Sequence, residues 1–149
     1  MSRARARSVA RLAAVQALYQ REMEATPIAK LLHEFHQHRL GATIEDATYA
    51  DAEVDFFNDV VKGVDARLAE IDALVSANLG PGWTLDRLDR SLRQILRAGA
   101  YELLARPDIP TGSVISEYLD VAHAFFAPKE KKFVNGVLDA VARSVRHGT

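Results

Sequence analysis

The chain has 149 residues, of which 48% are hydrophobic and 26% are charged, as is usual for one globular domain. It contains no cysteine, which excludes a disulfide framework and thiolate metal sites, and it has no apolar run long enough to cross a membrane. No signal peptide is recognisable, so a cytoplasmic protein is expected. The net charge of −1 conceals an uneven distribution of charge, with basic ends and an acidic middle segment. Residues 1–21 carry five arginines and no acid, residues 41–79 carry nine acids and two cations, and residues 129–149 carry five cations and two acids.

The first predicted helix, from about residue 4 to Ala25, combines a basic face with an apolar face. The arginines Arg3, Arg7, Arg11 and Arg21 project within about 80° of one another, so Arg7 and Arg11 are expected to be exposed. Basic N-terminal arms often contact nucleic acid, although a solvated or membrane-surface face has a similar pattern. The opposite face carries Val9, Leu12, Gln16, Tyr19 and Met23, where Tyr19 fits a core tyrosine and an RNA-contacting rim residue equally well.

The middle of the chain predicts two further helices. Thr26-Pro27 is a helix-start signal, with Thr at the N-cap and Pro at the first helical position, and this second helix should end near Gly41. Residues 41–50 are expected to form a loop. A third helix follows, with a heptad-like stripe that favours a central packed helix over a coiled-coil dimer; the stripe is Val54, Phe57, Val61, Val64, Leu68, Ile71 and Val75.

Gly80-Pro81-Gly82 is the clearest break, and it suggests helical subdomains over about 1–79 and 83–149. Trp83 should anchor this loop to the core, and Thr84 should cap the next helix. That helix turns four arginines mostly outward, which favours a solvated, salt-bridged face over an extended basic surface: Arg87, Arg90, Arg93 and Arg97. Its Tyr101-Glu102-Leu103 segment is expected to pack against other helices, and a further helix spans 113–127.

The last predicted helix, which Pro128 opens, carries an aromatic residue beside positive charge. Phe133 lies about 40° outside the apolar stripe that begins at Val134, and Lys132 precedes it, with Lys129 and Lys131 just upstream. A ring for base stacking and cations for phosphates are what a single-stranded nucleic acid needs. The same pattern also fits an edge-of-core phenylalanine with ordinary surface lysines.

No catalytic or metal-binding pattern is evident. His33, His36 and His38 lack the spacing of four residues that puts two ligands on one helix face. There is no phosphate-binding glycine loop and no nucleophile elbow. We therefore expect a protein that is not an enzyme and that holds no cofactor or metal.

Five segments in order resemble the NusB family of bacterial transcription antitermination factors, over about residues 5–142. They are Val-Gln-Ala-Leu-Tyr (15–19), Leu-Arg-Ala-Gly-Ala-Tyr-Glu-Leu (96–103), Asp-Ile-Pro (108–110), Ile-Ser-Glu (115–117) and Lys-Phe-Val-Asn-Gly-Val-Leu-Asp (132–139). The resemblance implies an all-α fold of six or seven helices in two small bundles. It also implies that the two basic ends of the chain are neighbours and form one RNA-binding patch.

The function that the resemblance implies is recognition of a single-stranded boxA RNA element, as in ribosomal RNA leaders. The implied partner is NusE, a ribosomal small-subunit protein, within an antitermination complex with RNA polymerase. The family's motif positions carry over to Arg7, Arg11, Gln16, Tyr19, Lys132, Phe133 and Asn135, and Arg3, Arg5, Lys129 and Lys131 complete the candidate RNA-binding set. The chain departs from the usual family residues at Ser116, Phe126, Lys129, Glu130 and Lys131.

Two other classes of function deserve comparison. A NusB-like module also begins certain rRNA cytosine methyltransferases, but this length leaves no room for a methyltransferase domain. A protein-binding helical adaptor without RNA affinity is the remaining alternative, with the acidic segment 41–79 docking a basic ribosomal protein. The sequence leaves open the preferred RNA sequence, the NusE contact surface and the choice between monomer and dimer.

Overall fold

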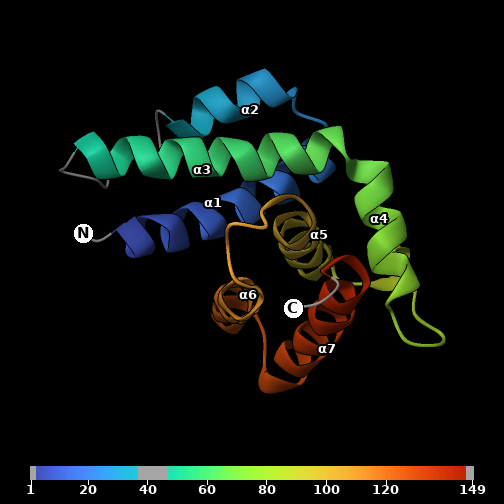
Figure 1. Ribbon diagram of the computed structural model, residues 1–149. Helices are drawn as coiled ribbons and strands as arrows, with labels where there is room; N and C mark the ends of the chain where they lie inside the picture. Colours follow the sequence, from blue (N-terminus) through green and yellow to red (C-terminus); the bar gives the residue numbers. More distant parts are fainter. Residues whose placement is uncertain (1–2, 37–46, 147–149) are drawn as a thin grey trace. The chain divides into compact units, whose positions relative to one another are not determined.

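The computed structural model describes residues 3–36 and 47–146, and every regular element within these ranges is helical, as predicted. The elements are α1 (Arg3–Glu24), α2 (Ile28–Phe35), α3 (Ala47–Ala66), α4 (Leu68–Ala77), the short 3-10 helix η2 (Leu85–Arg87), α5 (Arg90–Ala105), α6 (Thr111–Phe125) and α7 (Pro128–Val145) (Figure 1). None of these helices is both long enough and apolar enough to cross a membrane.

The chain divides into two compact units, Met1–Gly63 and Val64–Thr149. This division differs from the boundary expected at 80–82, because α4 packs against α5 and so belongs to the second unit. The predicted third helix is also interrupted, since α3 ends at Ala66 and α4 begins at Leu68. Leu68 was expected in the core stripe but is 37% exposed at the start of α4, whereas Ile71 and Val75 further along the same stripe are fully buried.

Arg67 occupies the interruption with φ −114° and ψ 25°, outside the helical region. Its Nε donates to Glu70 Oε1 at 2.8 Å, which closes the first turn of α4 with an ion pair. This hydrogen bond lowers the pKa of the Glu70 carboxyl. The pair is exposed, so its contribution to stability is small.

In the first unit, the turn between α1 and α2 differs from the predicted cap. Ala25 adopts φ 52°, in the left-handed region, and this ends α1 at Glu24. The helix α2 begins at Ile28 and has no side-chain cap, so the prediction of Thr26 as N-cap was wrong. Thr26 instead presents its carbonyl oxygen to Arg21, which donates from Nη1 at 2.7 Å. The predicted end of this helix near Gly41 lies outside the described residues.

Aromatic packing joins α2 to α3 in the same unit. The rings of Phe35 and Phe57 stack with centroids 5.4 Å apart. His36 lies beside them, with Nε2 2.7 Å from Asn58 Oδ1. Residues 47–50 were expected in a loop but form the first turn of α3.

The core of the second unit lies where α5, α6 and α7 pack on one another. A Cβ atom added at Gly99 would lie 2.9 Å from Leu138 Cδ2, so glycine allows α5 and α7 to approach closely. Glu102 is fully buried and accepts a short hydrogen bond from the Tyr118 hydroxyl of α6. The predicted packing role of the Tyr101-Glu102-Leu103 segment is thereby confirmed.

The entry into α5 corrects two expectations. Thr84 precedes only the short η2, and the cap of α5 is Asp89, whose Oδ1 accepts from Ser91 N at 2.8 Å and Leu92 N at 3.2 Å. Arg97 does not point into solvent. It is buried and donates from Nε and Nη2 to the two carboxylate oxygens of Asp72, at 2.7 and 2.9 Å. This bidentate pair joins α5 to α4.

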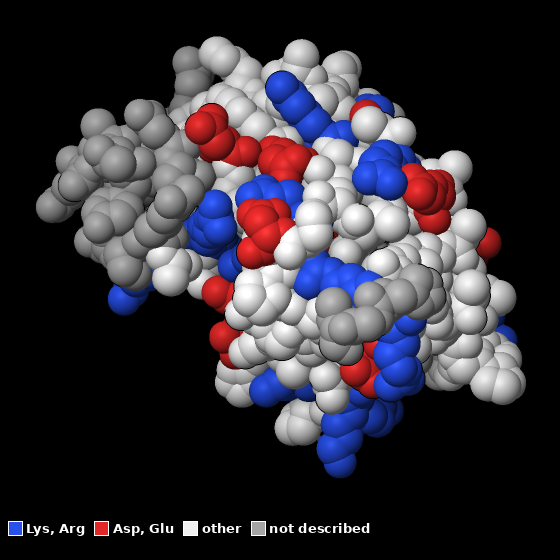
Figure 2. Space-filling model, viewed as in Figure 1, with Lys and Arg blue, Asp and Glu red and all other residues white. Residues whose placement is uncertain are grey.

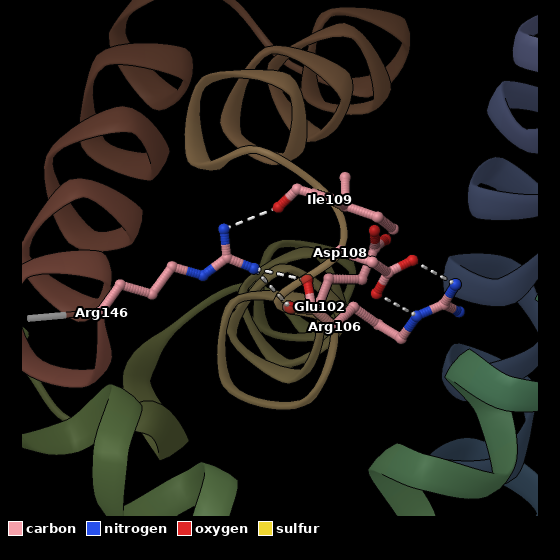
Figure 3. A network of polar contacts seen from close by, with 5 residues as sticks. All are labelled: Glu102, Arg106, Asp108, Ile109 and Arg146. Atoms are coloured by element: carbon pink, nitrogen blue, oxygen red, sulfur yellow. Dashed lines mark hydrogen bonds and ion pairs between the residues drawn. The ribbon is translucent and has the colours of Figure 1, made fainter. Parts of the chain in front are cut away.

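Arg146, just after α7, binds the turn between α5 and α6 (Figure 3). Its guanidinium donates to four carbonyl oxygens and one hydroxyl: Glu102 O at 3.2 Å, Leu103 O at 2.9 Å, Arg106 O at 2.6 Å, Ile109 O at 2.7 Å and Thr111 Oγ1 at 3.1 Å. Three of these oxygens belong to the last turn of α5 and the residue that follows it, where helix carbonyls run out of intrahelical donors, although Glu102 O also accepts from Arg106 N and Arg106 O from Ile109 N. A side chain at the end of the sequence thus completes the hydrogen bonding of a helix about forty residues earlier.

Candidate nucleic-acid interface

The first turns of α7 present a row of cations. Pro128 occupies the first helical position, as predicted, because a proline there loses no intrahelical hydrogen bond. Lys129, Lys132 and Asn135 are exposed, whereas Lys131 is half-buried with Nζ 3.4 Å from His123 Nδ1. Figure 2 shows a group of Lys and Arg side chains at the lower end of the view, where α7 begins in Figure 1.

Beside these lysines lies a pair of aromatic rings. Phe133 is half-buried while its neighbour Val134 is fully buried, which confirms the predicted position at the edge of the core. Trp83 was expected to anchor its loop to the core, but it is 51% exposed. Its ring packs on Phe133 with centroids 5.7 Å apart and an angle of 53° between the planes. Two adjacent rings are thus reachable from solvent next to positive charge, which is the arrangement of a base-stacking platform.

The two rings form part of a pocket of about 550 Å³, a volume typical of sites that bind small molecules. The pocket lies in the second unit, between the start of α7 and the segment from η2 to α5. Its lining combines aromatic, apolar and charged side chains: Trp83, Arg87, Leu88, Asp89, Leu92, Phe126, Lys129, Glu130 and Phe133. Sequence reasoning found Lys129 and Phe133 but missed Trp83 as a site residue, although an aromatic residue after a Gly-Pro-Gly turn was a signal for it.

The second candidate surface, in the first unit, is built on α1. Arg7 and Arg11 are one turn apart, and both guanidinium groups lie over the ring of Phe56 of α3, at 4.8 and 4.7 Å from its centre. Arg11 is 4% exposed, so the expectation that it lies on an exposed face was wrong. Sequence reasoning missed Phe56 because it lies outside the heptad stripe that includes Phe57.

The other predicted residues of α1 have different environments. Arg5 is exposed, Gln16 is half-buried, and Tyr19 is 39% exposed at the rim. The side chain of Arg3 lies outside the described part of the structure. The predicted set therefore forms two groups, one in each unit, and the single patch formed by both ends of the chain stays a prediction.

Within the described ranges, no group of three or more His, Asp or Glu residues could hold a metal ion. His36 contacts Asn58, and His38 lies outside the described residues. The chemistry that these surfaces offer is noncovalent: ring stacking, charge and hydrogen bonding.

The model of the NusB family matches residues 8–143 of this chain. Curated relatives carry the description transcription antitermination protein NusB. The relative from Sphingopyxis alaskensis is 66% identical over 144 residues, which are 97% of each chain. The relative from Novosphingobium aromaticivorans is 69% identical over 142 residues, which are 95% of this chain and 96% of that protein.

Solved structures resemble the chain as well. A structure of NusB from T. maritima has a TM-score of 0.77 at 32% identity and covers 96% of this chain and 92% of its own. A crystal structure of antitermination factors NusB and NusE in complex with dsRNA has a TM-score of 0.79 at 26% identity and covers 94% and 98%.

Proposed function

Because the chain belongs to the NusB family, we propose that it is a transcription antitermination factor that binds a boxA-type single-stranded RNA element, especially in transcripts of ribosomal RNA operons. It acts together with NusE, the partner that appears with a NusB protein and dsRNA in a related crystal structure. The complex then joins RNA polymerase. The protein contributes assembly rather than catalysis.

The observation that carries the proposal is the pair formed by Trp83 and Phe133 beside Lys129 and Lys132. Single-stranded RNA exposes both faces of its bases and a charged backbone, so rings and cations on one surface match it. Duplex RNA hides its base faces within the stack and gives such rings nothing to bind. This difference favours a single-stranded element as the ligand.

The candidate residues divide by role. Arg3, Arg5, Arg7, Arg11, Lys129, Lys131 and Lys132 supply charge for phosphates, which raises affinity for any RNA sequence. Gln16 and Asn135 offer side-chain amides to base edges, and Phe133 offers a ring for stacking, with Tyr19 at the rim of α1. Arg11 acts differently from the rest, because its guanidinium is buried over Phe56 and contributes charge without an open contact surface.

Fluorescence anisotropy with a labelled boxA-like RNA tests the proposal. The titration is made with and without NusE, and it is repeated with a scrambled strand of equal composition and with the boxA strand annealed to its complement. We expect the single strand to bind more tightly than both controls and NusE to increase its affinity. Absence of RNA binding in every arm, with NusE still binding, would favour the helical adaptor without RNA affinity.

A further inference from the structure

The pocket beside the start of α7 has the chemistry of a site for one RNA base. We propose that it takes a single unstacked base that carries an exocyclic amine, and that Glu130 accepts the hydrogen bond from this amine. Cytosine, adenine and guanine would be accepted, and uracil would be rejected. The inference rests on the proposed RNA binding and adds a residue that selects among bases.

Three aromatic side chains give the pocket its stacking surfaces. Trp83 and Phe133 lie against each other, and Phe126 lines the same space from the end of α6. Leu88 and Leu92 are buried and line it with apolar surface. A flat, weakly hydrated base fits such walls better than a phosphate or a sugar does.

Glu130 lines this pocket with a carboxylate that can accept a hydrogen bond from a ligand. Its Oε2 is buried and has no hydrogen-bond partner among the described residues, although lysines precede and follow it in the sequence. A buried acceptor without a partner is unfavourable, so a ligand that donates a hydrogen bond to it binds more tightly than one that cannot. Carboxylates accept from the amine of cytosine, whereas the corresponding position of uracil is a carbonyl oxygen, which repels the acceptor.

The other acid of the pocket is already engaged. Asp89 Oδ1 accepts from two backbone amides at the start of α5 and its side chain is exposed to water, so Glu130 supplies the buried acceptor of the lining. Of the two cations in the lining, Arg87 donates to the carbonyl of Gly82 at 3.0 Å and holds the loop that carries Trp83. Lys129 is exposed at the pocket and is placed to meet the phosphate of the bound nucleotide.

Trp83 provides a direct readout because it is the only tryptophan of the chain. We expect its emission to change when boxA-like RNA is added and to follow the anisotropy of the labelled strand. When NusE is needed, it is added first, so that the subsequent change reports the RNA. RNA binding by anisotropy with no change in Trp83 emission would overturn the pocket and leave the proposed function intact.

Base analogues test the acceptor. Each amine-bearing base of the RNA is replaced in turn by its analogue without the amine: inosine for guanosine, purine riboside for adenosine and zebularine for cytidine. At one position we expect the intact protein to lose about tenfold in affinity. Glu130→Ala should lose most of this discrimination and bind the analogue RNA about as well as the intact protein does.

Lys132→Ala is the matched control, because Lys132 is an exposed neighbour that does not line the pocket. It should weaken binding to all strands alike and preserve the discrimination, as expected of a phosphate contact. Unchanged discrimination in Glu130→Ala, or equal affinities for every analogue in the intact protein, would overturn the role of Glu130. If no RNA binds at all, the proposed function fails together with the pocket.

Discussion

The guanidinium of Arg11 lies 4.7 Å from the centre of the Phe56 ring, with the guanidinium of Arg7 at 4.8 Å from the same centre. One ring of α3 therefore holds two cations of α1. This contact gives the two arginines a structural role within the first unit in addition to any contact with RNA.

Arg11→Ala should destabilise the protein by about 1–2 kcal/mol, because it removes a desolvated cation–π contact and the packing of the alkyl stem. Arg5→Ala is the control, since Arg5 is exposed on the same helix and its loss should change stability by less than about 0.5 kcal/mol. Urea unfolding of both variants measures the difference. Equal stability of the two variants would mean that the ring contact contributes nothing.

Phe133→Ala should weaken binding of boxA-like RNA about tenfold or more, because a stacked base contributes roughly 1–3 kcal/mol. Its stability should fall only modestly, since the ring is already half-exposed. Leu138→Ala provides the comparison: Leu138 is fully buried on the same helix, and its truncation should cost about 2–5 kcal/mol. If Phe133→Ala left RNA affinity unchanged and lost as much stability as Leu138→Ala, Phe133 would be a core residue and not a stacking residue.

RNA binding should depend strongly on salt. If the lysines of α7 and the arginines of α1 contact about four phosphates, the logarithm of the association constant falls against the logarithm of salt concentration with a slope of roughly −3. Anisotropy titrations between low and physiological salt give this slope. A slope near zero would exclude these cations from the contact.

Arg146→Ala should destabilise the second unit by about 2 kcal/mol or more, because it removes the donors of the Leu103 and Ile109 carbonyl oxygens and the link between α7 and the turn after α5. Arg146→Lys should restore little of this loss, since an ammonium cannot reproduce the planar set of donors. Arg143→Ala serves as the control, because within residues 3–36 and 47–146 Arg143 pairs only with Asp139, in an exposed ion pair on its own helix. Thermal unfolding that does not separate Arg146→Ala from Arg143→Ala would contradict the bridging role.

Local features of the sequence determined the helices and much of the core. The periodic apolar stripe of the last helix places Val134 and Leu138 inside and Phe133 at the edge, because 3.6 residues per turn fix which side chains share a face. Pro128 determined where α7 begins, because proline is tolerated in the first turn and not within a helix. The resemblance of short motifs was enough to indicate the family that the comparisons identify.

Contacts between distant segments were decided only by the tertiary structure. Helical periodicity placed Arg11 and Arg97 toward solvent, but each is buried by a partner on another helix, Phe56 and the carboxylate of Asp72. The pairing of Trp83 with Phe133, and the buried oxygen of Glu130 beside them, likewise arise where separate elements meet. A side chain's direction on its own helix follows from local geometry, whereas the group that meets it depends on how the helices pack.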